Sequence, residues 1–167
     1  TVYPATLWAV RYGSTDVMES SDRGVSWKTL GAANLASDEL RAIALPPPPN
    51  SWKPWVGCGP FDPGIFHHDG TSWSDKSAGL PSIDAKRIEG IAVVDADTVY
   101  LATWEGVFKT VDRGASWTPL GASSLSYAYD VLPPPAGRPS ELWAGTYKGA
   151  ALSRDQGANW EAFAAGI

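Results

Sequence analysis

Four tryptophans recur along the chain at a nearly constant spacing. Trp27, Trp73, Trp117 and Trp160 are separated by 46, 44 and 43 residues, and each ends a similar octapeptide. The first, third and fourth copies fit the pattern Ser/Thr-x-Asp-x-Gly-x-Ser/Asn-Trp. Self-similarity at a fixed period of about 20 to 50 residues is typical of folds that repeat one supersecondary unit. The period therefore predicts a repeat architecture before any single element is assigned.

The octapeptide has the composition of a tight turn between two strands. Asp22 can accept hydrogen bonds from turn amides, and Gly24 can take the positive φ that other residues resist. The second copy is degenerate, because His68 stands where the others have aspartate and Asp69 follows one position later. The residues expected to shape the four turns are Ser20, Asp22, Gly24 and Trp27; Asp69, Gly70 and Trp73; Thr110, Asp112, Gly114 and Trp117; and Ser153, Asp155, Gly157 and Trp160.

Short apolar runs with strand character precede each octapeptide. One run lies about 15 to 20 residues before each of the four tryptophans, at 7–10, 54–57, 99–102 and 142–145. A second lies next to the octapeptide, at 16–18, 64–66, 106–108 and 149–151. Three units have an earlier run, at 40–45, 88–94 and 127–132. With the strand after the turn, each full unit has four strands.

This pattern predicts an all-β chain, and more specifically a β-propeller of four-stranded antiparallel blades around an axis. About four blades are expected, from repeats at about 1–38, 39–79, 86–121 and 126–167. The aromatic residues at one equivalent strand position, Trp8, Trp55, Tyr100 and Trp143, are expected to pack between blades.

The first unit starts at its second strand, so its inner strand is missing. Thr1–Ala5 is the only candidate to complete it, and Pro4 would interrupt the hydrogen-bond ladder. Unpaired strand edges favour aggregation, and propellers avoid them by closing a ring. Three arrangements remain open: a piece of a larger propeller, association with another copy or subunit, or a small ring that closes alone.

The octapeptides ending at Trp27, Trp117 and Trp160 resemble the Asp-box, or BNR repeat. This repeat is found in sialidases, xyloglucanase-type glycoside hydrolases, sortilin-type receptors and photosystem assembly factors. The resemblance covers nearly the whole chain as architecture. It implies a propeller whose box hairpins are structural and remote from the functional face, and it implies an extracytoplasmic or secreted protein.

Charge and composition argue against several classes of protein. A count of 13 Lys and Arg against 18 Asp and Glu leaves no cationic excess, so we expect no nucleic acid partner. No apolar run reaches the roughly 18 residues of a membrane helix, so no membrane insertion is expected. Cys58 is the only cysteine and cannot form an intramolecular disulfide. His67 and His68, as neighbours in a strand, point to opposite faces and are interpreted as part of the degenerate turn; no metal or cofactor is expected.

No catalytic residue is predicted. A sialidase would need an arginine triad. Arg23, Arg113 and Arg154 lie inside the octapeptides, and the four arginines that remain do not make a convincing triad: Arg11, Arg41, Arg87 and Arg138. A glycosidase needs two carboxylates that flank the scissile bond. The conceivable carboxylates lie near predicted strand ends and are interpreted as solvated loop charges: Glu39, Glu89, Glu105 and Asp130.

The loops are expected to lie on two opposite faces. The box hairpins and the proline-rich links at 46–49 and 133–135 should share one face. On the other face, Tyr12, Trp104 and Tyr147 end equivalent strands, while Arg41, Glu89 and Tyr129 begin equivalent strands. Aromatic rings beside charged groups suit stacking on a sugar or anchoring of a protein. These six residues are the predicted binding set.

The sequence therefore favours a non-catalytic propeller module that binds a protein or a glycan, or serves in structural assembly. A homo-oligomer or a neighbouring subunit that completes the first blade is a further prediction. The alternative is a fragment or subunit of an Asp-box glycoside hydrolase.

Overall fold

The computed structural model describes residues 6–11, 13–30, 35, 39–47, 53–121, 125–135 and 137–163. In this part, fifteen strands form four separate sheets. The first sheet contains β1 (Leu7–Val10), β2 (Val17–Ser20) and β3 (Lys28–Thr29). The second contains β4 (Leu40–Ala44), β5 (Trp55–Cys58), β6 (Ile65–His68) and β7 (Trp73–Asp75). The third contains β8 (Ile88–Val93), β9 (Val99–Thr103), β10 (Val107–Thr110) and β11 (Thr118–Leu120). The fourth contains β12 (Ala128–Leu132), β13 (Leu142–Thr146), β14 (Gly149–Ser153) and β15 (Glu161–Phe163).

Each sheet is an antiparallel meander in which strands that follow one another in sequence lie side by side. Within the described residues, three sheets have four strands and the first has three, which confirms the prediction of an all-β propeller architecture with about four blades. The segment Thr1–Ala5, the candidate for the inner strand of the first blade, lies outside the described residues.

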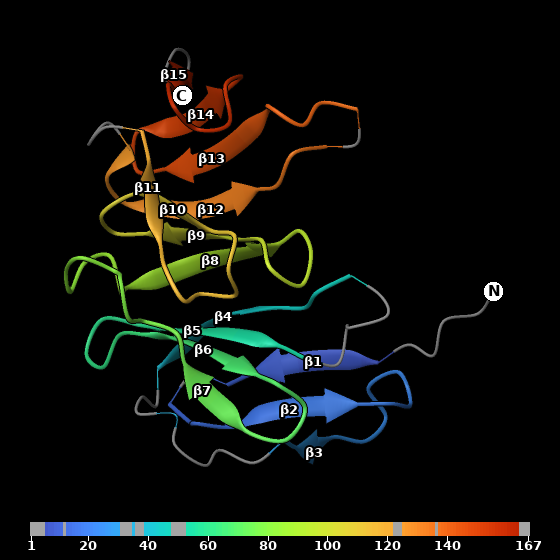
Figure 1. Ribbon diagram of the computed structural model, residues 1–167. Coiled ribbons are helices and arrows are strands. Elements are labelled where there is room, and N and C mark those ends of the chain that lie inside the picture. Colours follow the sequence, from blue (N-terminus) through green and yellow to red (C-terminus); the bar gives the residue numbers. More distant parts are fainter. Residues whose placement is uncertain are drawn as a thin grey trace.

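The four blades stack in a row (Figure 1). The first strands β4, β8 and β12 of the complete blades contact one another in series, and β1 contacts β4. The first and fourth blades lie at opposite ends of the row in Figure 1. Among the described residues the blades therefore form an open series, and the predicted alternative of a small ring that closes alone is not the arrangement observed.

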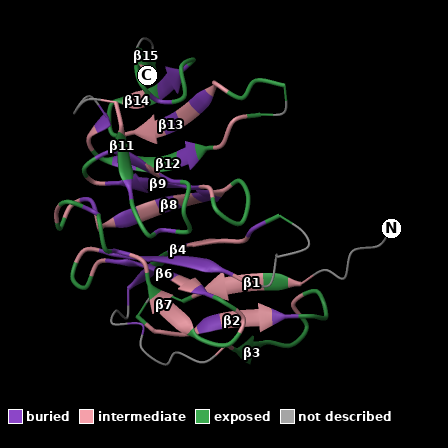
Figure 2. Cartoon of the chain, viewed as in Figure 1, coloured by how far each residue is buried: buried purple, intermediate pink, exposed green. Residues whose placement is uncertain are grey.

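The core lies between the blades and consists of three hydrophobic clusters, one at each joint. Trp55 of the second blade is buried in one cluster against residues of the third blade, and Tyr100 of the third is buried against the fourth. Trp8 packs half-buried against the cluster between the first two blades. Figure 2 shows the consequence, since β9 in the third blade is buried along its length while β3 and β15 are exposed.

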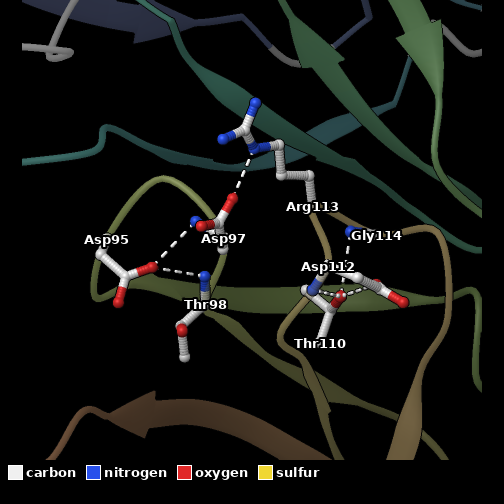
Figure 3. Close-up of polar contacts among 7 residues, drawn as sticks. All are labelled: Asp95, Asp97, Thr98, Thr110, Asp112, Arg113 and Gly114. Carbon is white, nitrogen blue, oxygen red and sulfur yellow. Dashed lines mark hydrogen bonds and ion pairs between the residues drawn. The ribbon is translucent and has the colours of Figure 1, made fainter.

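The octapeptides form the turns between the third and fourth strands of the blades. In the third blade, the Asp112 carboxylate accepts hydrogen bonds from the Ser116 amide at 2.9 Å and the Thr110 hydroxyl at 2.6 Å. The same hydroxyl accepts from the Gly114 amide at 2.9 Å (Figure 3). Asp22 and Asp155 accept equivalent bonds in the first and fourth blades. These aspartates thus close the turns, as their spacing predicts.

The degenerate second turn uses different partners for the same purpose. The Asp69 carboxylate accepts from the Thr71 and Ser72 amides at 2.7 and 2.9 Å, and His68 Nδ1 accepts from the Gly70 amide at 3.1 Å. Displacement of the aspartate by one position therefore still provides acceptors for the turn amides.

The links between the first and second strands lie beside these turns. The Arg113 amide donates to the Asp97 carbonyl at 3.1 Å, and its guanidinium pairs with the Asp97 carboxylate at 2.5 Å (Figure 3). In the fourth blade, the Gln156 amide donates to the Ser140 carbonyl at 2.9 Å. In these two blades, the octapeptide turn and the link between the first and second strands thus lie at one edge. The loops between the second and third strands, and between consecutive blades, lie at the opposite edge.

Candidate binding surface

A β-bulge interrupts the inner strand of each complete blade at the same place. The pairing register shifts between residues 40 and 42 in β4, between 88 and 90 in β8, and between 128 and 130 in β12. The extra residues are Arg41, Glu89 and Tyr129. Bulges disrupt the ladder locally and re-aim a side chain, and they are common beside functional sites. These three residues, which occupy equivalent positions in the sequence repeats, thus share a β-bulge.

A polar cluster joins the second and third blades at this edge. Arg41 Nη1 lies 3.3 Å from Glu89 Oε2, and the Trp104 indole Nε1 donates to Glu89 Oε1 at 2.8 Å. The Glu89 side chain is only 14% exposed, so its charge is held by these two donors rather than by bulk water. The guanidinium carbon of Arg87 lies 4.4 Å from the centre of the Trp104 ring, a cation–π distance. The indole of Trp104 therefore has a charged partner at its edge and another on its face.

An aromatic row continues from Trp104 across the fourth blade. The ring centres of Trp104 and Tyr127 are 5.6 Å apart, and those of Tyr127 and Tyr147 are 6.4 Å apart. The backbone fixes this order, because the Tyr127 amide donates to the Trp104 carbonyl at 2.8 Å and the Tyr147 amide donates to the Tyr127 carbonyl at 3.0 Å. Tyr127 is 47% exposed and Tyr147 is 75% exposed. We call Trp104, Tyr127 and Tyr147 the aromatic row.

Tyr127 has a strained backbone. Its φ of 56° lies in the left-handed region, which a bulky side chain seldom adopts. The other described non-glycine residues with positive φ, Arg23, Arg113 and Gln156, all occupy one equivalent position in the octapeptide turns. Among the described residues, Tyr127 is the only non-glycine residue outside these turns with a positive φ. In this conformation its ring lies between those of Trp104 and Tyr147.

The structure brings together four of the six residues of the predicted binding set. Arg41, Glu89 and Trp104 form the polar cluster, and Tyr147 ends the aromatic row. Tyr129 is 47% exposed, and among the described residues its ring contacts none of the other rings. Tyr12 lies outside the described residues.

Two residues of the surface were not in the predicted set. Arg87 immediately precedes β8, and nothing in its local sequence indicates that its guanidinium lies over the Trp104 ring. Tyr127 immediately precedes β12, and nothing in its local sequence indicates a positive φ.

The four carboxylates considered for glycoside hydrolysis occupy different surroundings. Glu39 is buried, whereas the Glu89 carboxylate belongs to the polar cluster. Glu105 is exposed and accepts a hydrogen bond from the Ser82 hydroxyl. Asp130 lines a cavity on the outer face of the fourth blade and accepts a hydrogen bond from the Val131 amide.

A small cavity of about 120 Å³ lies at the opposite edge, between the second and third blades. Its lining residues are Pro46, Lys53, His67, Ala96 and Arg113. Burial, with the positive charges of Lys76 and Lys53, lowers the pKa of His67 to about 4. Its ring stacks on Trp55 with centres 4.4 Å apart, so the neutral imidazole serves packing.

Within the described ranges, no three His, Cys, Asp or Glu side chains are grouped so that they could hold a metal ion. The same part of the chain contains no helix long and apolar enough to cross a membrane.

The comparison with known sequences finds no matching family model and no matching curated protein. Solved structures do match. An ancestral GH74 enzyme shares 23% identity with a TM-score of 0.72, over 95% of this chain and 23% of that one. YCF48 bound to a D1 peptide shares 20% identity with a TM-score of 0.69, over 95% of this chain and 51% of YCF48.

A third similar structure is the extracellular domain of a putative one component system from B. thetaiotaomicron, with 15% identity and a TM-score of 0.67 over 94% of this chain. The chain covers 20% of that protein and so spans from a fifth to about half of these three structures. At these identities the likeness shows the fold alone. The chain has the β-propeller fold, as do the GH74 enzyme, YCF48 and the extracellular domain of the putative one component system.

Proposed function

We propose that the chain is a non-catalytic propeller module that binds a protein segment or a glycan on the aromatic row. The observation that carries this proposal is the pair of exposed tyrosines, Tyr127 and Tyr147, continued by Trp104 and flanked by the Arg41–Glu89 ion pair. Flat rings cover the apolar face of a sugar or anchor a side chain of a protein. The charged groups beside them then orient hydroxyls or backbone groups.

Pre-organisation supports the same proposal. Backbone hydrogen bonds join the three residues of the row in order, and two ring contacts hold Tyr127 in place. A ring that is already ordered loses little conformational entropy when a ligand covers it. The strained φ of Tyr127 supports a functional role, because such strain clusters at ligand-binding sites.

The experiment measures equilibrium binding to two panels of probes. The glycan panel contains xyloglucan oligosaccharides, motivated by the xyloglucanase resemblance, and the peptide panel contains the D1 peptide that is bound to YCF48. Tyr127→Ala and Tyr147→Ala are each expected to weaken binding about tenfold, which is about 1.4 kcal/mol. The control Phe163→Ala removes an exposed ring of the same blade outside the row and should leave the affinity unchanged. Equal losses in all three variants contradict the proposal.

The alternative is a subunit or fragment of a glycoside hydrolase, and the GH74 fold similarity favours it. Release of reducing ends from xyloglucan distinguishes the two functions. The module should release none above the background of a Glu89→Gln variant. Release that depends on Glu89 would establish hydrolysis and contradict a purely binding role.

We further propose an extracytoplasmic location. The similarity to the extracellular domain of a sensor system supports it. Protease treatment of intact cells that express the tagged chain provides the test, since only an external chain is digested.

A further inference from the structure

The joints between consecutive blades repeat one mode of packing. At the joint of the second and third blades, Trp117 meets Trp55 edge to face, with ring centres 6.5 Å apart and an interplanar angle of 84°. The Trp117 indole also donates to the Lys76 carbonyl of the second blade at 2.8 Å. Gly114 completes the joint, because a Cβ at that residue would lie 3.3 Å from the Trp55 ring. The turn of each blade thus seats on the strands of the blade before it.

The other two joints follow the same rule. Between the third and fourth blades, a Cβ at Gly157 would lie 2.8 Å from Leu120, and a Cβ at Gly121 would lie 2.5 Å from the Trp160 ring. Between the first and second blades, Trp73 and Trp8 pack on one cluster. The joint therefore has two halves. The following blade supplies an octapeptide turn with its tryptophan and glycine, and the preceding blade supplies a sheet face with an aromatic residue in its second strand.

The first blade presents the turn half of a joint, and none of the blades that the structure describes seats against it. Trp27 is 43% exposed and Leu7 is 42% exposed. Within the described residues, a Cβ at Gly24 would meet only Leu7 and Trp27, which belong to the same blade. We call the surface of Leu7, Gly24 and Trp27 the leading face.

The fourth blade presents the sheet half. Trp143, which the sequence places with the aromatics that pack between blades, is only half-buried, and its ring contacts Phe163 of its own blade at 5.7 Å. Leu132 is 55% exposed and Phe163 is 46% exposed. A shallow cavity of about 250 Å³ lies here, lined by Asp130, Leu132, Trp143, Ala144, Gly145 and Ala150. We call the surface of Leu132, Trp143, Ala150 and Phe163 the trailing face.

We propose that the trailing face of one copy receives the leading face of a second copy, with Trp27 seated against Trp143 as Trp117 is against Trp55. The two exposed faces carry the equivalents of the residues that meet at the joint of the second and third blades, and equivalent residues share one cluster at each of the other two joints. Each copy of the four described blades offers one of each face, so the contact is heterologous, and two such contacts close a pair of four-blade units into one ring of eight blades. Eight blades lie within the range that propellers adopt.

The experiment measures the molar mass of the full chain by size-exclusion chromatography with light scattering over a range of concentrations. The expected mass is twice that of the monomer. Trp27→Asp and Trp143→Asp should each yield monomers, because every contact in the pair then contains one damaged face. Phe163→Ala, which shortens the trailing face without adding a charge, should shift dissociation to higher concentration. Tyr147→Ala should remain a dimer, which separates this proposal from the binding role of the aromatic row.

Mixing the two charge variants tests the head-to-tail geometry. A Trp27→Asp chain and a Trp143→Asp chain retain one intact contact between them, so a mixed pair should form, whereas a chain with both substitutions should stay monomeric. Circular dichroism verifies that each variant is folded. A monomeric wild-type chain at all concentrations overturns the proposal, and so does a dimer that survives both substitutions. Failure of the folded variants to pair on mixing also overturns it.

Discussion

The indole Nε1 of Trp104 donates a hydrogen bond of 2.8 Å to Glu89, and the other oxygen of that carboxylate faces Arg41 of the neighbouring blade at 3.3 Å. Trp104 is half-buried, and it is therefore a positioning residue as well as a member of the aromatic row. It holds the carboxylate in place, and the two tyrosines beyond it provide most of the accessible aromatic surface.

Trp104→Phe is expected to destabilise the chain by about 1 to 2 kcal/mol, because it removes a hydrogen bond to a charged acceptor. A double-mutant cycle with Glu89→Ala isolates the pair, and urea denaturation supplies the four free energies of unfolding. We expect a coupling free energy of about 1 kcal/mol. Strict additivity of the two substitutions would show that the hydrogen bond contributes nothing.

Tyr127→Gly should be more stable than Tyr127→Ala. Both variants lose the ring, so their difference reports the backbone alone. At ordinary dihedral angles, glycine is less stable than alanine by about 0.5 to 1 kcal/mol, but at the φ of 56° the order reverses. Thermal unfolding of the two variants measures the difference. A more stable alanine variant would mean that position 127 is not strained.

The lowered pKa values of the turn aspartates predict that the folded chain loses stability at acidic pH. Hydrogen bonds from Ser116, then from Thr110, lower the pKa of Asp112 from 3.8 to about 2, and Ser26 and Asn159 have the main roles at Asp22 and Asp155. The folded pKa lies below the unfolded value, so the unfolded state takes up the proton first. The stabilising contribution is complete above about pH 4 and is lost as the pH falls towards 2.

Urea midpoints measured between pH 5 and pH 2 check this dependence. Asp112→Asn keeps an acceptor oxygen without the charge, so its stability should fall less steeply with pH than that of the wild type. Identical slopes for both proteins would exclude the Asp112 carboxylate as a source of acid sensitivity.

Two glycines form a matched pair for testing the joint between the third and fourth blades. Gly157 and Gly137 have φ values of +91° and +83°, so alanine is strained at both, by about 1 to 2 kcal/mol. A Cβ at Gly157 would also lie 2.8 Å from Leu120, whereas nothing lies within 4 Å at Gly137. Gly157→Ala should therefore cost about 1 to 3 kcal/mol more than Gly137→Ala. Equal losses in urea denaturation would argue against tight packing at this joint.

The sequence predicted the blades because their determinants are local and repeat. Asp112 reaches its partners within four residues, and the tryptophan that ends the octapeptide, such as Trp117, recurs in every unit. The spacing of the repeats does not specify how neighbouring blades are angled, so whether the row closes could not be predicted from it.

The candidate surface was predicted only in part, for a similar physical reason. Comparison of the repeats placed Arg41 and Glu89 at equivalent positions. It did not indicate their ion pair, because the two residues are 48 positions apart and lie on different blades. The bulges that re-aim these side chains and the positive φ of Tyr127 have no local sequence signature. Tertiary contacts determine them.

The most direct test of the binding role compares the wild-type chain with a Tyr127→Ala/Tyr147→Ala double variant, using the probe from the glycan or peptide panel that binds most tightly. Isothermal titration calorimetry measures the dissociation constant, and a thermal melt checks the fold. The aromatic row predicts a loss of affinity of more than about tenfold with the melting temperature nearly unchanged. Equal affinity of the two proteins, or a panel in which no probe binds the wild type, would contradict the proposed function.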